Sequence, residues 1–200
     1  MQTTRLPRAE LNMTQLDIVG LCGSLRAGSI NRMALNLVGR SMPQGMTLDT
    51  VELRDIPFFD GDVLAKGFPP SVLALRERIR KSDGVVIATP EYNFSIPGVL
   101  KNALDWVSRG DDQPFAHKPV AILSASPGPL GGARVQYDLR KVMLFMNAQV
   151  LAKPEVFIGA ASGKFAPDGS CTDEATRNFA SDQMAAFQRW IAGVQRMALA

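Results

Sequence analysis

The 200-residue chain carries 22 Lys and Arg against 19 Asp and Glu, a net charge of +3. This length predicts one domain, which needs no disulfide or metal to fold. Two cysteines and one histidine argue against a disulfide scaffold and a Cys/His zinc site. A hydrophobic content of 46% with 20% charged residues argues against disorder.

The ends and the charge pattern narrow the class of protein further. There is no run of about 18 apolar residues, so no transmembrane helix is predicted. The Lys and Arg are dispersed, so no nucleic-acid surface is predicted. Residues 1–14 lack the apolar core of a signal peptide. We therefore expect a cytoplasmic protein with a flexible tail over 1–14 and a single domain over 15–200.

From residue 16 onward, short apolar segments alternate with segments of helical periodicity. In chain order, the first part predicts a strand at 16–22, a helix at 31–41, a strand at 46–53, a long loop, and a helix around 72–79. The second part predicts a strand at 85–89, a helix at 100–107, a strand at 120–124, a helix at 135–146, a strand within 150–158 interrupted near Pro154, and a helix at 174–195.

Apolar strands that alternate with helices are typical of a parallel sheet covered on both faces. The five units predict an α/β protein, a flavodoxin-like three-layer sandwich with a five-stranded parallel sheet in the order 2-1-3-4-5. Ligands of such sheets bind beyond the carboxyl ends of the strands. The loops after the first, third and fourth strands are therefore the candidate binding loops.

The first loop, residues 23–32, has the character of a phosphate site. It leads into a helix, whose first N–H groups are free. Ser24, Ser29 and Asn31 are neutral donors, and the Arg26 guanidinium matches phosphate oxygens. The segment is neither GxGxxG nor a Walker motif, so a monophosphate is the better fit. The alternative is an ordinary turn with Ser29 or Asn31 as the N-cap.

The other two loops suit a flat ligand. Residues 90–98 offer an aromatic face and amide groups on which a heterocycle could stack. Alternatively, Tyr92 and Phe94 pack on the body of the protein. Residues 124–132 are rich in glycine, which allows close backbone approach. Alternatively, Gly131 and Gly132 simply begin the next helix.

Three segments carry a family resemblance: GSLRAGSIN at 23–31, TPEYNFSIPGVLKNALDW at 89–106 and SASPGPLGGAR at 124–134. In their order and spacing, the chain over about 16–195 resembles the NADPH-dependent FMN reductase family, and within it the soluble bacterial chromate and quinone reductases. The resemblance implies noncovalently bound FMN, NADPH or NADH as hydride donor, and a homodimer or homotetramer. The implied activity is hydride transfer through FMN to quinones, or to acceptors such as chromate, azo compounds or free flavin.

The resemblance also implies which residues bind FMN. Those expected around the phosphate are Ser24, Arg26, Ser29 and Asn31, with Leu25 and Ile30 in main-chain or apolar contact. Those expected to border the isoalloxazine ring are Pro90, Glu91, Tyr92 and Asn93, with Ser126 and Gly128 near its other polar edge. No protein nucleophile or base is required, and no catalytic residue is assigned.

Other interpretations remain open. A flavodoxin-type electron carrier shares the fold, but such carriers are usually strongly acidic and this chain is slightly basic. A non-enzymatic flavin-binding module and a nucleotide-binding domain without flavin are further alternatives. Cys22 is interpreted as a small buried residue at the end of the first strand. Leu144 and Phe145, which lie off the core stripe of their helix, are predicted to belong to a subunit contact.

Overall fold

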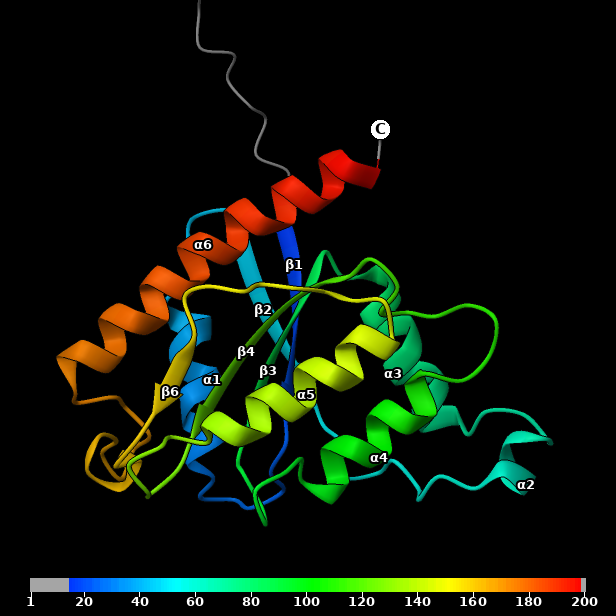
Figure 1. Ribbon diagram of the computed structural model, residues 1–200, viewed down its shortest axis with the longest axis horizontal. Coiled ribbons are helices and arrows are strands. Elements are labelled where there is room, and N and C mark those ends of the chain that lie inside the picture. The colour runs from blue at the N-terminus through cyan, green and yellow to red at the C-terminus, as the bar shows by residue number, and fades with distance from the viewer. Residues whose placement is uncertain (1–14, 199–200) are drawn as a thin grey trace, which may run out of the picture.

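The computed structural model describes residues 15–198, so the predicted tail over 1–14 lies outside the described residues. A parallel sheet forms the centre, in the order β2-β1-β3-β4-β5, with β6 also paired to β4 (Figure 1). The strands are β1 Leu16–Cys22, β2 Met46–Val51, β3 Gly84–Thr89, β4 Pro119–Ala125, β5 Gln149–Val150 and β6 Val156–Ile158. The helices are α1 Ile30–Arg40, α2 Gly61–Leu64, α3 Pro70–Lys81, α4 Gly98–Val107, α5 Ala133–Phe145 and α6 Glu174–Ala198.

The sheet separates two apolar cores, because its central strands are buried on both faces. Ile18 of β1 packs with α1 and α6 on one face. Its neighbour Val19 packs with α3, α4 and α5 on the other face. This alternation along a continuous apolar strand is what a doubly covered parallel sheet requires. The three-layer prediction and the strand order are therefore confirmed.

The fifth predicted strand is two separate strands in the structure. The interruption expected near Pro154 divides it into β5 and β6, so the sheet has six strands rather than five. Proline has no N–H group with which to continue the hydrogen bonding of a sheet. Two buried glutamine side chains instead donate hydrogen bonds to carbonyls next to the interruption. The Gln183 amide donates to the Ile122 carbonyl at 3.0 Å, and the Gln136 amide donates to the Val156 carbonyl at 2.8 Å. Local periodicity also failed to predict the one-turn helix α2 inside the long loop.

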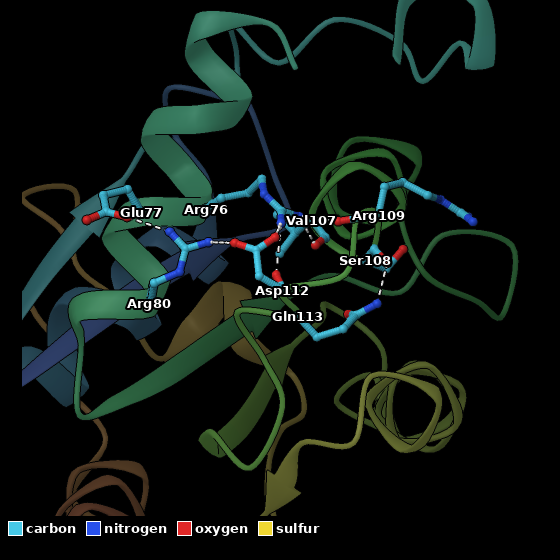
Figure 2. A network of polar contacts seen from close by, with 8 residues as sticks. All are labelled: Arg76, Glu77, Arg80, Val107, Ser108, Arg109, Asp112 and Gln113. Atoms are coloured by element: carbon cyan, nitrogen blue, oxygen red, sulfur yellow. Dashed lines mark hydrogen bonds and ion pairs between the residues drawn. The ribbon is translucent and has the colours of Figure 1, made fainter. Parts of the chain in front are cut away.

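A polar network on the α3 and α4 side fixes the turn before β4, as Figure 2 shows. Arg76 of α3 is only 2% exposed. Its Nη1 donates to the carbonyls of Val107 and Arg109, both at 2.6 Å, and its Nη2 donates to the Asp112 carbonyl at 2.9 Å. Asp112 also forms ion pairs with Arg76 and Arg80. The buried guanidinium thus satisfies the carbonyl of Val107, which the end of α4 leaves unpaired, and two carbonyls in the loop that follows.

Two classes of feature are absent from residues 15–198. No helix there combines the length and apolarity that a membrane crossing needs. No group of three or more His, Cys, Asp or Glu side chains in the same range is arranged to hold a metal ion.

Candidate functional site

A cleft of about 210 Å³ lies where the loops after β1, β3 and β4 meet. The residues that line it are Ser24, Arg26, Ser29, Ile30, Asn31, Pro90, Glu91, Tyr92, Ala125, Ser126 and Pro127. All the predicted site residues are among them except Leu25, Asn93 and Gly128. Sequence reasoning did not assign Ala125 or Pro127 to the site. The topology thus brings together three loops that are far apart in the chain.

The first loop forms a donor-rich end of the cleft. Ser24 and Ser29 are buried, and the Ser29 Oγ accepts a hydrogen bond from the Arg32 N–H at 3.3 Å. Ser29 is thus the N-cap of α1, as the alternative interpretation proposed. The N–H groups of Ile30 and Asn31, in the first turn, have no carbonyl of their own helix to bind. The cap and an anion-binding helix end are therefore compatible.

Asn31 joins the first loop to the third. Its Nδ2 donates to the Ala125 carbonyl and its Oδ1 accepts from the Ala125 N–H, both at 2.9 Å. An amide side chain has a second Nδ2 hydrogen, so the predicted phosphate contact through Asn31 does not conflict with this pairing. The bidentate contact holds the start of α1 against the end of β4.

Gly23 is required by the close approach of two strands. A Cβ placed there would lie 2.5 Å from the Thr89 Oγ1 and 3.3 Å from the Pro90 Cδ. No real side chain tolerates the first of these distances. The absence of a side chain at Gly23 therefore allows the exits of β1 and β3 to run side by side, and the first two loops to share one cleft.

The second loop displays its aromatic residues instead of burying them. Tyr92 and Ser95 exchange backbone hydrogen bonds at 3.1 and 3.0 Å, and Asn93 and Phe94 between them have left-handed φ angles of 52° and 66°. Tyr92 is 49% exposed and Phe94 67% exposed. The alternative that both rings pack on the body of the protein is therefore wrong. The Arg134 guanidinium stacks on the Phe94 ring, with its carbon 4.1 Å from the centroid.

Glu91 lines the cleft, but its carboxylate is directed to the start of α5. The Oε2 accepts a hydrogen bond from the Val135 N–H at 3.2 Å, in addition to two contacts with Arg134. Carboxylates stabilise a helix N-terminus through its partial positive charge. The side chain therefore fixes the wall of the cleft, and a ring-bordering role for Glu91 would fall to its backbone.

The third loop both begins a helix and lines the cleft. Gly132 is the N-cap of α5, with a left-handed φ of 80°, as the alternative interpretation expected. A Cβ there would lie 2.9 Å from the Ser124 Cβ. Gly128 does not line the cleft; its carbonyl accepts from the Ser126 Oγ at 3.2 Å and from the Ala160 N–H at 3.1 Å. Gly128 thus shapes the turn that presents Ser126.

Arginines at the first loop include one that sequence reasoning missed. The Arg26 Nη2 donates to the Gly28 carbonyl at 2.8 Å. Arg54, which follows β2, donates through Nη2 to the Leu25 carbonyl at 2.6 Å. No motif contains Arg54, because this contact depends on β2 lying beside β1.

The arrangement fits FMN in the chemistry of its two ends. Two buried hydroxyls, the Arg26 guanidinium and the start of α1 are donors suited to a phosphate. Pro90, Tyr92 and Pro127, from the other two loops, are uncharged and suit a flat ring. The carboxylate in the lining, that of Glu91, is already hydrogen-bonded to α5.

Comparisons with known proteins agree with this chemistry. Residues 16–163 match the family model described as NADPH-dependent FMN reductase. An NAD(P)H-dependent FMN reductase of Pseudomonas aeruginosa is 45% identical over 176 residues, which are 88% of this chain and 95% of the relative. A quinone reductase of Escherichia coli K12 is 46% identical over 184 residues, covering 90% and 98% of the two chains.

A solved structure extends the agreement to the fold. The flavoenzyme NAD(P)H:(acceptor) oxidoreductase FerB of Paracoccus denitrificans superposes with a TM-score of 0.82 at 35% identity. The match covers 89% of this chain and 98% of FerB. The flavodoxin-like fold and the expected FMN and NAD(P)H are therefore confirmed at the level of the family.

Proposed function

Because the chain belongs to the NADPH-dependent FMN reductase family, and is therefore an oxidoreductase, we propose that it reduces quinones with NADPH or NADH through FMN bound in the cleft. The observation that carries this proposal is the cleft itself, because donors suited to a phosphate and the uncharged side chains of Pro90, Tyr92 and Pro127 line one cavity. The name of the Escherichia coli relative, a quinone reductase, supports the choice of acceptor.

The proposed role of the protein is to bind and orient. Bound FMN supplies the hydride-accepting chemistry, as cofactors generally do. Ser24, Arg26 and Ser29 would hold its phosphate, with Asn31 and the helix start beside them. Pro90 and Tyr92 would border the ring on one side, and Ser126 on the other. Backbone N–H groups at the ring's polar edge would stabilise negative charge there.

The proposed reaction does not use a cysteine or histidine side chain as an acid, base or nucleophile. Cys22 is buried behind the first loop. His117 precedes β4, so it lies at the end of the sheet opposite the cleft. We assign no protein proton donor, because a hydride transfer from nicotinamide needs none in the protein.

The acceptor site is proposed to be open to several oxidants. Tyr92 lines the cleft and is half exposed, so an aromatic acceptor has a ring to stack on. Chromate, azo compounds and free flavin are proposed as secondary acceptors after quinones. The protein would act in the cytoplasm, and cell fractionation tests that placement.

We also propose a homodimer or homotetramer in which α5 contributes to a subunit contact. Leu144 is 79% exposed and Phe145 72% exposed at its end. Phe145 borders a groove of about 260 Å³ between α4 and α5, with Leu104 and Val142 in its lining. Sedimentation of a Leu144→Ser, Phe145→Ser variant should show smaller particles than the native protein. An unchanged sedimentation coefficient contradicts this contact.

The decisive experiment is spectroscopic. The purified protein, supplied with FMN, should show a flavin spectrum that NADPH bleaches under anaerobic conditions and a quinone restores. Retention of FMN with no bleaching by NADPH indicates a carrier, and bleaching without turnover of any acceptor indicates a binding module. A colourless preparation that does not take up FMN overturns the proposal.

A further inference from the structure

Two arginines flank the first loop and are held in place by its backbone. The Arg26 guanidinium donates to the Gly28 carbonyl at 2.8 Å, and the Arg54 guanidinium donates to the Leu25 carbonyl at 2.6 Å. A guanidinium has five N–H donors, so each keeps several for a ligand. Arg26 comes from the loop itself and Arg54 from the connection after β2.

The two charges are not neutralised by carboxylates. Arg32, in the first turn of α1, is paired with Glu52 at 2.7 Å. Across the part of the chain that the structure describes, neither Arg26 nor Arg54 has an Asp or Glu oxygen within ion-pair distance. Glu52 is paired with Arg32. Arg26 in the cleft lining and Arg54 beside the first loop are therefore two positive charges without a carboxylate partner among the described residues. Such a cluster attracts anionic groups.

The two arginines occupy different sides of the loop. Arg26 lines the cleft, and Arg54 does not. FMN has one phosphate, which the donors inside the cleft would take. Arg54 contacts the Leu25 carbonyl, and neither residue lines the cleft, so the Arg54 charge is available to a phosphate outside the cleft. NADPH differs from NADH by one phosphate, on the 2′ position of the adenosine ribose, and is far too large to enter the cleft whole.

We propose that Arg54 binds the 2′-phosphate of NADPH and makes the protein prefer NADPH to NADH. This proposal rests on the proposed function, because it assumes that the nicotinamide end of the donor enters the cleft. The charge on Arg54, rather than its hydrogen bond to Leu25, is the property that discriminates between the two dinucleotides.

Matched variants separate the effect of the Arg54 charge from that of its hydrogen bond to the Leu25 carbonyl. Arg54→Gln keeps an N–H donor for the Leu25 carbonyl and loses the charge, whereas Arg54→Lys keeps the charge. Lys66→Gln removes one exposed charge from the same connection between β2 and α3, and serves as the control for net charge. Calorimetric titration of the FMN-loaded, oxidised protein with NADP⁺ and with NAD⁺ measures both affinities directly.

Arg54→Gln should weaken NADP⁺ binding about fivefold, as expected for a partly solvated charge pair, and leave NAD⁺ binding unchanged. Arg54→Lys should retain most of the preference, and Lys66→Gln all of it. The KM for NADPH should rise in Arg54→Gln with little change in kcat. Higher salt should weaken NADP⁺ binding more in the native protein than in Arg54→Gln.

Other outcomes overturn the proposal. Equal native affinities for NADP⁺ and NAD⁺, equal weakening of both, or no change in either leave Arg54 without a role in discrimination. Weaker binding of FMN to the apoprotein, with the NADP⁺ to NAD⁺ ratio unchanged, assigns Arg54 to the FMN phosphate instead. Failure of the proposed function is distinguishable, because native holoprotein would then not be reduced by either dinucleotide.

Discussion

The Glu91 carboxylate contacts Arg134 twice: its Oε2 accepts from the Arg134 N–H at 3.0 Å and its Oε1 from the Arg134 Nη1 at 3.1 Å. Arg134 is the second residue of α5, and the N-cap of that helix, Gly132, has no side chain. A residue of the second loop therefore caps the helix that begins in the third. This contact joins two walls of the cleft.

Glu91→Ala should destabilise the protein by about 1 kcal/mol, the usual cost of a lost helix cap. It should also weaken FMN binding, because the second and third loops would no longer be joined. Urea denaturation of the apoprotein and FMN titration measure the two effects. Arg134→Ala is the matched control: it removes the ion pair but keeps both backbone hydrogen bonds to Glu91, so its effect should be smaller. Equal losses in the two variants would contradict the capping role.

Arg26→Ala should weaken FMN binding by about 1.5–3 kcal/mol, the range for hydrogen bonds to charged groups. The guanidinium is exposed at the cleft and has donors beyond the one that binds the Gly28 carbonyl. Riboflavin, which lacks the phosphate, is the internal control, and its affinity should be the same for both proteins. An unchanged dissociation constant for FMN would count against phosphate binding by Arg26.

Arg76→Met should destabilise the protein by about 3 kcal/mol or more, because each buried carbonyl left without a donor costs about 1–3 kcal/mol. The carbonyls of Val107, Arg109 and Asp112 would lose their buried donor. Denaturant titration of the apoprotein checks this. FMN binding by the folded fraction should change little, since the network lies on the flank of α3 and α4 away from the cleft. A stability equal to that of the native protein contradicts this assignment.

Asp112 should make part of that stability depend on pH. Desolvation acts to raise the pKa of Asp112, but Arg76 and Arg80 outweigh it and hold the pKa below its usual 3.8. A group with a lowered folded-state pKa stabilises the fold above its unfolded-state pKa and stops doing so as the pH falls through the folded-state value. Asp112→Asn should therefore be less stable than the native protein at neutral pH, and the difference should shrink below about pH 4.

The neighbouring Asp111 provides the control for this pH dependence. Asp111 is exposed and forms no ion pair in the described part of the chain, so Asp111→Asn removes a neighbouring charge without breaking the contacts of Asp112. Thermal denaturation across the acid range compares the three proteins. A constant difference between Asp112→Asn and the native protein down to the lowest pH would rule out the proposed charge interaction.

Cys22 should react slowly with thiol reagents in the folded protein. The side chain is 1% exposed, and burial raises the pKa of its thiol, so little reactive thiolate is available. Cys171, which is partly exposed, should be alkylated first by iodoacetamide. Mass spectrometry of partly labelled protein distinguishes the two. Labelling of Cys22 as fast as Cys171 would show that the end of β1 opens readily.

The local pattern of the sequence was sufficient for most of the fold. A continuous apolar run and a period of 3.6 residues both depend on neighbours within a few positions, so the strand at 16–22 and the helix stripe at 135–146 were visible without any tertiary information. The alternation of the two types then implied the parallel sheet, its order and the three loops at its carboxyl edge. The one-turn helix α2 and the two-residue strand β5 are too short for a repeating pattern of apolar residues to be recognised.

Only the tertiary structure decided what the loop side chains contact. Asn31 pairs with Ala125, 94 positions later, Arg54 meets Leu25, and Glu91 caps the helix that contains Arg134. Each contact depends on which strands lie side by side and in what register. The identity of the two residues does not by itself reveal that they are neighbours. The sequence by itself determined the three loops that form the cleft and most of the residues that line it. The packing of the strands determined which of their polar atoms remain available for a ligand, because hydrogen bonds within the protein engage some of those atoms first.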